Sequence, residues 1–319
     1  MRVLAIDGGG IRGLIPAVVL TELERRTGRP ISDLFDLIAG TSTGGILACA
    51  LARPDASDPA RPRFTAQELV ALYVEEGPKI FDRSLLKRIR SVDGLVDERY
   101  EDDGLRAALD RYLGGAALSD ARTDVLVTAY ELEQRFAFLF RSSRARTDAT
   151  YDFAMADVAH ATSAAPTYFE PAVVRDRAGS QGYALIDGGV FATNPAMVAL
   201  AELTQAGLAP EVDLLLSLGT GEHTRPIHVA DARGWGRLEW ASRIVDVVFD
   251  GVAETVDFEA SQALGDRYIR LQTPLVEASD DLDDASPENL TALQAAGEAL
   301  VRERAAELDR VVELLGAPR

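Results

Sequence analysis

Three glycine-rich turns, each next to a short strand-like run, constrain the fold of this chain more than any other feature. They read Asp-Gly-Gly-Gly-Ile-Arg-Gly at 7–13, Gly-Thr-Ser-Thr-Gly at 40–44 and Asp-Gly-Gly at 187–189. The first two turns lie between an apolar run and a segment whose apolar residues have helical spacing. Two successive strand–turn–helix units predict a parallel sheet with helices on its faces. The expected fold class is therefore α/β.

The remaining sequence continues this alternation of strands and helices. Strands are expected at 3–6, 35–39, 125–129, 136–140, 183–186, 214–218 and 268–271. Helices are expected at 14–26 and 44–52, with a long terminal helix or helix pair at 288–315. Residues 53–63, rich in Pro, Asp and Arg, are expected to form a surface loop. Because no long polar linker or internal repeat divides the chain, we expect 1–319 to form a single domain.

Composition and charge exclude several classes of protein. The formal net charge of −18 repels nucleic acid and anionic membrane surfaces at long range, so we expect no nucleic-acid partner. The sequence shows no leader peptide and no apolar run long enough to span a bilayer, which predicts a cytoplasmic protein. The single cysteine, Cys49, can form neither an internal disulfide nor a thiolate zinc site, and we expect it in the core.

The second turn presents a candidate nucleophile, Ser42. A serine between glycines, after a strand and before a helix, can be held on a tight turn that exposes its hydroxyl. Gly40 and Gly44 supply the room that such a turn needs. The following helix directs its N-terminal amides at the turn, which favours negative charge developing there. An ordinary glycine-rich connection is the alternative interpretation of this motif taken alone.

The first turn has two interpretations. Gly8, Gly10 and Gly13 match the G-x-G-x-x-G pattern of dinucleotide-binding folds. That pattern needs an acidic residue at the end of the second strand to hold the ribose, whereas here the strand at 35–39 leads directly into the turn of Ser42. A nucleotide site is therefore disfavoured. If the two strand ends lie side by side, the glycine amides instead face Ser42 and can stabilise a tetrahedral oxyanion.

The third turn places Asp187 just beyond a strand-like run. An isolated Asp-Gly pair is usually only a turn, because aspartate tolerates the geometry and glycine supplies positive φ. As a partner of Ser42, however, this carboxylate can serve as the base that a serine nucleophile requires. The three turns together thus supply the groups that acyl-ester hydrolysis needs.

Taken in order, these motifs resemble those of patatin-like phospholipases and acyl hydrolases. The turn at 7–13 resembles the oxyanion motif of the family, residues 40–45 its nucleophile elbow and residues 187–189 its catalytic Asp-Gly-Gly element. Further matches are Thr-Ser-Ala-Ala-Pro-Thr-Tyr-Phe at 162–169, Asn-Pro at 194–195 and Ser-Leu-Gly-Thr-Gly at 217–221. The resemblance implies a three-layer patatin-like α/β fold with a mostly parallel central sheet flanked by helices.

The resemblance also implies an extent for the domain. It makes 1–319 a single patatin-like catalytic domain, with the family motifs in about 1–221 and a helical C-terminal extension in about 235–319. The last third is similar to bacterial patatin-like proteins that include effectors switched on by cyclic nucleotides in antiphage defence. A small-molecule activator is therefore among the expected partners.

By this resemblance each candidate residue has a role. Ser42 is the nucleophile and Asp187 the base of a two-residue catalytic dyad, while Gly8, Gly9 and Gly10 form the oxyanion hole. The implied activity is that of a lipid acyl hydrolase of the phospholipase A type, which cleaves fatty acyl esters of glycerophospholipids through an acyl-enzyme. No metal and no cofactor are implied. The partners are a phospholipid or other lipid ester and, transiently, a membrane surface, which extends the expected location to the inner membrane face.

Two further segments have open interpretations. Arg12, beside the expected oxyanion hole, is a candidate for binding a lipid phosphate, with a structural salt bridge as the alternative. At 83–90, Leu85, Leu86 and Ile89 alternate with basic residues, and the segment is expected to form either a lid that meets a bilayer or a covering helix.

Two other functions compete with the dyad. In a Ser-Asp-His carboxylesterase, His223 or His228 follows Ser42 and Asp187 in the chain order that α/β-hydrolases use. The other is a nucleotide-regulated defence effector that is inactive until switched on.

Overall fold

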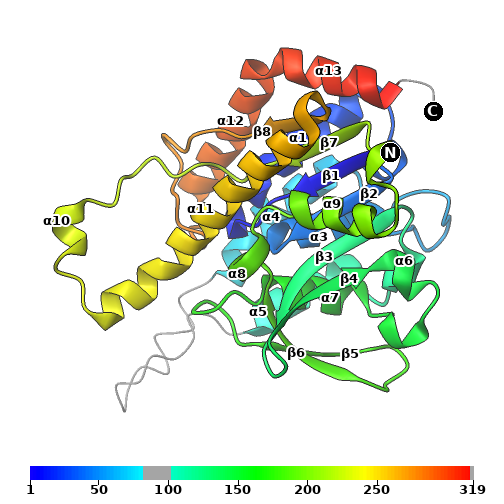
Figure 1. Ribbon diagram of the computed structural model, residues 1–319, viewed down its shortest axis with the longest axis horizontal. Coiled ribbons are helices and arrows are strands. Elements are labelled where there is room, and N and C mark those ends of the chain that lie inside the picture. The colour runs from blue at the N-terminus through cyan, green and yellow to red at the C-terminus, as the bar shows by residue number, and fades with distance from the viewer. Residues whose placement is uncertain (82–101, 317–319) are drawn as a thin grey trace.

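The computed structural model describes residues 1–81 and 102–316, and these residues form one mixed eight-stranded sheet (Figure 1). The strands are β1 (Arg2–Ile6), β2 (Leu37–Thr41), β3 (Asp124–Glu131), β4 (Phe136–Arg141), β5 (Ala172–Arg175), β6 (Gly182–Asp187), β7 (Leu214–Leu218) and β8 (Tyr268–Leu271). β3, β2, β1, β7 and β8 lie in this order and run parallel. β4 and β6 pair antiparallel with β3, and β5 pairs antiparallel with β6. The predicted strands are all present, and β5, a strand of four residues, is an addition.

Helices cover both faces of this sheet (Figure 1). They are α1 (Leu14–Thr27), α2 (Ile31–Leu34), α3 (Thr43–Ala52), α4 (Ala66–Ile80), α5 (Asp102–Leu113), α6 (Ser142–Ala145), α7 (Met155–Ser163), α8 (Gly189–Ala192), α9 (Ala196–Gln205), α10 (Val229–Ala232), α11 (Arg237–Leu264), α12 (Pro287–Glu303) and α13 (Ala305–Gly316). The expected terminal helix pair is thus confirmed as α12 and α13, and residues 53–63 form the expected loop. Figure 1 shows α10 and the first turns of α11 extending away from the sheet.

The alternation of side chains along the central strands separates the core into two layers. Leu4 and Ile6 of β1 pack in one apolar cluster with α1, α3, α4, α7 and α12, whereas Val3 and Ala5 pack in a second cluster with α9 and α11. Successive residues of a strand point to opposite faces, so an apolar strand such as β1 is buried on both. The chain therefore has the expected three layers.

The first core cluster also contains Cys49. Its side chain is fully buried, as predicted, and burial raises the pKa of the thiol to about 12. The thiolate form, which is the reactive one, is therefore suppressed.

The C-terminal third is not only helical, because β8 adds the outermost parallel strand beside β7. No helix in the described part of the chain is both long enough and apolar enough to cross a bilayer. The candidate lid at 83–90 lies outside the described residues.

The three strands that pair with β3 determine where the loop after β2 meets the loop after β6. β4 pairs along Leu126–Glu131 and so occupies one edge of β3. β2 pairs with 124–128 and β6 with 129–131, which means that β2 and β6 share the other edge, end to end. The last residue of β2, Thr41, lies opposite Thr128, and the last residue of β6, Asp187, lies opposite the next residue, Ala129.

Candidate active site

Ser42 occupies a strained turn between β2 and α3. Its φ of 54° and ψ of −123° lie in a region that non-glycine residues rarely adopt. The residues two positions before and after it must be glycine, because a Cβ on Gly40 would stand 2.2 Å from the carbonyl oxygen of Gly44, and one on Gly44 would stand 2.1 Å from that of Ile6. Helix α3 begins at the next residue, Thr43. The amides of its first turn have no partner within the helix, and they face the turn of Ser42.

Asp187 reaches Ser42 through the shared edge of β3. Because Thr41 and Asp187 pair with successive residues of β3, the two loops that follow lie next to each other. The side chains of Thr41 and Thr128 are joined by a hydrogen bond of 2.8 Å at this junction, and a Cβ on Gly188 would clash with Thr128. The two candidate residues, 145 positions apart in the numbering, therefore line one cavity.

The carboxylate of Asp187 is fully buried, and only one of its two oxygens has a hydrogen-bond partner among the described residues. Oδ1 accepts a hydrogen bond of 2.7 Å from the amide of Gly189, whereas Oδ2 has no hydrogen-bond partner among the described residues. Burial raises the pKa of Asp187 to about 7, and the nearby Ser42 hydroxyl and the Gly189 amide partly oppose this rise. A general base is most effective when its pKa lies near the working pH.

The raised pKa predicts that Asp187→Asn stabilises the protein above neutral pH. The native state holds this proton more tightly than the unfolded chain, so ionisation of Asp187 lowers stability progressively as the pH rises from about 4 to about 7. The variant lacks this cost, and a shift from 3.8 to about 7 corresponds to at most about 4 kcal/mol. Urea unfolding should show the largest gain at pH 8 and a shrinking gain toward pH 4.

Exposed Glu313 on α13 provides the control for this prediction, because Glu313→Gln should change stability little at either pH. An equal gain for Asp187→Asn at pH 5 and pH 8 would contradict the assigned shift.

The glycine loop after β1 contributes two free amides to the cavity. Gly9 and Gly10 line it, and neither amide has an acceptor among the described residues. Gly10 has a φ of +57°, and a Cβ there would stand 2.2 Å from the carbonyl oxygen of Leu282. Two amides of this kind can stabilise a tetrahedral oxyanion.

The amide of Gly8 is not available for this purpose, which corrects the expectation of three glycine donors. It donates a 2.9 Å hydrogen bond to the carbonyl oxygen of Thr193, and the Thr220 hydroxyl donates to the carbonyl oxygen of Gly8 at 2.7 Å. A Cβ on Gly8 would come within 3.3 Å of the Cβ of Ser42, so a larger residue there would press on the turn of Ser42. Thr193, directly before the Asn-Pro segment, and Thr220 of the Ser-Leu-Gly-Thr-Gly segment thus hold the loop in place.

Arg12 also differs from its expected role. Its side chain is buried, does not line the cavity of Ser42, and donates to the carbonyl oxygens of Gly9 at 3.4 Å and Asp280 at 3.2 Å. Nη1 lies 2.7 Å from Nε2 of His223. Because these bonds hold the guanidinium inside the protein, Arg12 supports the glycine loop rather than presenting a site for a lipid phosphate.

A buried ion pair supports the same loop from β8. Arg270 donates two hydrogen bonds to the carboxylate of Asp7, at 2.9 and 2.6 Å, and a third to the hydroxyl of Ser217 at 2.8 Å. Asp7 directly precedes the three glycines, so the pair fixes the start of the loop.

Arg270→Met should lower the free energy of unfolding by about 3–5 kcal/mol, because the carboxylate of Asp7 would then be buried without its partner. Urea unfolding measures this loss. The double variant Asp7→Asn/Arg270→Met should recover part of the stability, and no recovery would show that the loss has another origin.

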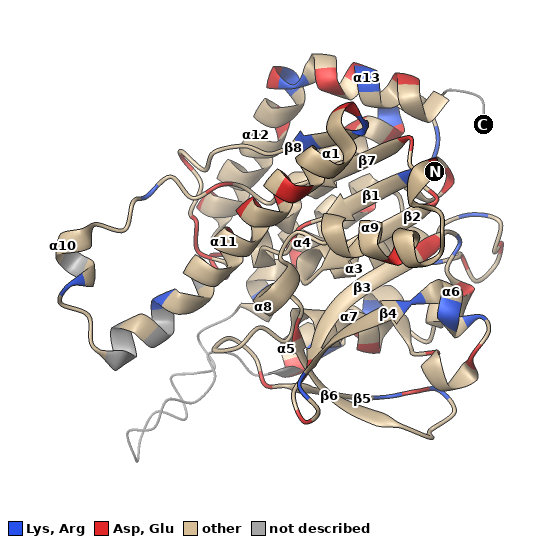
Figure 2. Cartoon of the chain, in the orientation of Figure 1, with Lys and Arg blue, Asp and Glu red and all other residues tan. Residues whose placement is uncertain are grey.

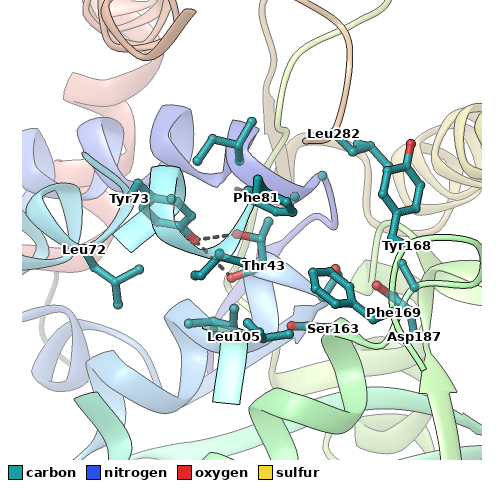
Figure 3. A pocket seen from close by; sticks show the side chains of 18 of the residues that line it. Thr43, Leu72, Tyr73, Phe81, Leu105, Ser163, Tyr168, Phe169, Asp187 and Leu282 are labelled. Atoms are coloured by element: carbon teal, nitrogen blue, oxygen red, sulfur yellow. Dashed lines mark hydrogen bonds between the residues drawn. The ribbon is translucent and has the colours of Figure 1, made fainter. Parts of the chain in front are cut away.

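The cavity that holds Ser42 and Asp187 is apolar over most of its surface. Its walls come from α3, α4, α5, α7 and α11, and Figure 3 shows Leu72, Leu105 and Phe81 pointing into it. Tyr168 and Leu282 stand together on one side (Figure 3). The hydroxyl of Thr43 can donate to that of Tyr73 at 2.5 Å, and the hydroxyl of Tyr73 donates to the carbonyl oxygen of Thr43 at 3.4 Å, so both hydroxyl hydrogens have an acceptor. The cavity encloses about 70 Å³, and its apolar walls match a hydrocarbon chain in polarity.

Neither His223 nor His228 lines this cavity. Because an arginine always donates, Nε2 of His223 accepts from Arg12, and its Nδ1 faces Asp250 at 3.6 Å. Both ring nitrogens of His223 thus face residues other than Ser42 and Asp187. This arrangement disfavours the Ser-Asp-His alternative.

Comparison with known proteins extends these observations. Residues 4–200 match the family model described as Patatin-like phospholipase. The chain is 35% identical to Patatin-like protein 2 of Arabidopsis thaliana, over 97% of this chain and 84% of that protein. It is 30% identical to "Probable inactive patatin-3-Kuras 1" of Solanum tuberosum, over 96% of this chain and 88% of that protein. The crystal structure of VipD from Legionella pneumophila superposes with a TM-score of 0.42 at 13% identity, covering 95% of this chain and 67% of that one.

Proposed function

The chain belongs to the patatin-like phospholipase family, a family of lipid acyl hydrolases, and we propose that it is a phospholipase A that acts through Ser42 and Asp187. The observation that carries this proposal concerns Asp187, which lines the same apolar cavity as Ser42 and whose buried Oδ2 has no hydrogen-bond partner within residues 1–81 and 102–316. A buried polar atom without a partner is costly and therefore calls for a functional reason.

In the first half of the proposed reaction, Oγ of Ser42 attacks the acyl carbonyl carbon while Oδ2 of Asp187 takes the hydroxyl proton. The amides of Gly9 and Gly10 stabilise the oxyanion of the tetrahedral intermediate, supported by the N-terminus of α3. The intermediate then collapses, the bond to the leaving alcohol breaks, and Asp187 returns the proton to the lysophospholipid. The acyl group remains as an ester on Ser42.

In the second half, Asp187 takes a proton from a water molecule, whose oxygen attacks the acyl-enzyme carbonyl. Collapse of this second intermediate releases the fatty acid and restores the proton to Ser42. The raised pKa of Asp187, about 7, supports both steps, because a carboxylate with an ordinary pKa near 3.8 is a much weaker base. The reaction requires neither a metal nor a cofactor.

We also propose that residues 1–319 act as one catalytic domain. Phe249 of α11 and Leu282 line the cavity of Ser42, and Arg270 of β8 holds the glycine loop. The C-terminal third is therefore part of the site. The substrate resides in membranes, so we infer transient contact with a membrane surface at the cytoplasmic side.

Product analysis tests the proposed reaction directly. Purified protein is incubated with a glycerophospholipid that carries two different acyl chains, and products are identified by mass spectrometry. We expect a free fatty acid and the matching lysophospholipid. Diacylglycerol or phosphatidic acid as the primary product would contradict the proposal.

Because one relative is named as inactive, turnover must be measured and not inferred from membership of the family. A parallel reaction contains a cyclic nucleotide. Fatty acid release only in its presence would support the nucleotide-regulated effector instead.

A further inference from the structure

A second cavity, of about 700 Å³, lies against the cavity of Ser42 and shares two of its wall residues, Tyr168 and Leu282. Its volume is in the range that holds a small ligand. Its lining mixes apolar residues with several charged ones and is more polar than that of the cavity beside it. A molecule with an ester at Ser42 and a polar group beyond Tyr168 and Leu282 would therefore meet an apolar site at one end and a polar one at the other.

Cationic groups of this second cavity come from the segment around α10 and from α11. Arg225 and Arg243 line it with exposed side chains, and the imidazole rings of His223 and His228 also belong to the lining. Figure 2 shows basic residues along this loop and on the first turns of α11. A guanidinium is well suited to bind phosphate, since it offers several donors in a planar fork.

Carboxylates come from the loop before α12 and from α11. Asp280 and Asp281 follow one another on that loop, and Asp250 lies on α11. Arg225 already lies 3.4 Å from Asp280, with 72% of the arginine side chain exposed. An anion that entered alone would meet these carboxylates, whereas a group with both charges would be stabilised by both sets of residues.

Trp235 adds an aromatic surface to the same cavity. Its ring packs edge to face with Trp240, with centroids 5.1 Å apart. Indole is the strongest aromatic partner for a cation, and quaternary ammonium groups are recognised in this way. The lining thus combines a phosphate-binding group, carboxylates and an aromatic ring.

We propose that this cavity binds the phosphate and ammonium groups of a zwitterionic glycerophospholipid head group while the acyl ester lies at Ser42. The inference rests on the proposed phospholipase function and adds its head-group specificity. Arg225 and Arg243 bind the phosphate. Asp281 and Trp235 bind the ammonium group.

Matched mixed micelles of dioleoyl phosphatidylcholine, phosphatidylethanolamine and phosphatidylglycerol test this proposal. Each rate is divided by the rate of the same variant on p-nitrophenyl butyrate, which has no head group. We expect the wild type to prefer the two zwitterionic lipids over phosphatidylglycerol by about tenfold or more, the size of one charge-assisted hydrogen bond.

Three variants separate the roles. Arg243→Gln should lower kcat/KM for all three lipids by about tenfold, because all carry the phosphate. Asp281→Lys should remove or reverse the preference over phosphatidylglycerol. Trp235→Leu should lower the rate on phosphatidylcholine more than that on phosphatidylethanolamine, which distinguishes choline from ethanolamine as the bound group.

Exposed residues of α12 and α13 supply the matched controls. Arg302→Gln and Glu313→Lys make the same charge changes away from both cavities and should leave all ratios unchanged. Wild-type ratios near one, or ratios that none of the three variants moves, would overturn the head-group proposal while butyrate hydrolysis continues. A wild type that hydrolyses neither p-nitrophenyl butyrate nor any of the lipids would instead contradict the proposed function.

Discussion

Ser42→Ala should reduce kcat/KM for ester hydrolysis by about 10⁴-fold or more, because it removes the only atom that can form the acyl-enzyme in the proposed reaction. Alanine is slightly smaller than serine and tolerates the same neighbours, so the variant should fold. The rate on p-nitrophenyl butyrate and on a phospholipid measures the effect. A fluorophosphonate probe should label Ser42 in the wild type and leave the variant unlabelled.

Ser163 offers a matched control within the same cavity. Its hydroxyl is buried, lines that cavity and has no hydrogen-bond partner among the described residues. Ser163→Ala therefore removes a comparable oxygen from the same surroundings and should preserve most of the activity. Equal losses in the two variants would contradict the assignment of Ser42 as nucleophile.

The turn of Ser42 could be recognised in the sequence because its geometry is local, and the role of Ser42 as nucleophile stays a prediction. A nucleophile on a strained turn needs glycines at fixed offsets, and Gly40 and Gly44 leave that requirement visible in five residues. The strands before these turns are equally visible, since a strand buried on both faces is a continuous apolar run. The α/β fold and the two loops that carry Ser42 and Asp187 follow from such short-range patterns.

The availability of individual donors could not be predicted in this way. Whether the amide of Gly8 is free depends on the carbonyl oxygen of Thr193, and the position of the Arg12 guanidinium depends on His223 and on a carbonyl of the loop before α12. These partners are separated from the first turn by well over a hundred residues, and main-chain carbonyls carry no signature in a sequence. The Asn-Pro motif beside Thr193 was the available signal.

The walls of the cavities escaped prediction for a related reason. Phe249 lies in a helical segment with ordinary apolar spacing, and Leu282 lies in an acidic loop at 280–284. Only the packing of α11 against α8 and α9 brings Phe249 to Gly189. The cost of burying Asp187 arises from this packing, because apolar side chains around the carboxylate remove water from it. Its raised pKa is thus a property of the assembled layers and not of the Asp-Gly-Gly turn.

Asp187→Asn should lower kcat/KM by about 10²–10⁴-fold, the range that a general base contributes. The side-chain oxygen of asparagine can still accept a hydrogen bond from the amide of Gly189, but asparagine cannot take a proton from Ser42. In the wild type, kcat/KM should rise with pH, reach half its maximum near the Asp187 pKa of about 7 and level off above it. A pH series on p-nitrophenyl butyrate measures this profile.

The variant should keep its small residual activity but lose the inflection near pH 7. A variant with near wild-type activity, or a wild-type profile that is flat between pH 5 and pH 8, would contradict the role of Asp187 as base. The same substitution should make the protein more stable at pH 8. Asp187→Asn should therefore raise stability and lower activity. Such opposite changes are expected when a buried charge is kept for catalysis at the expense of stability.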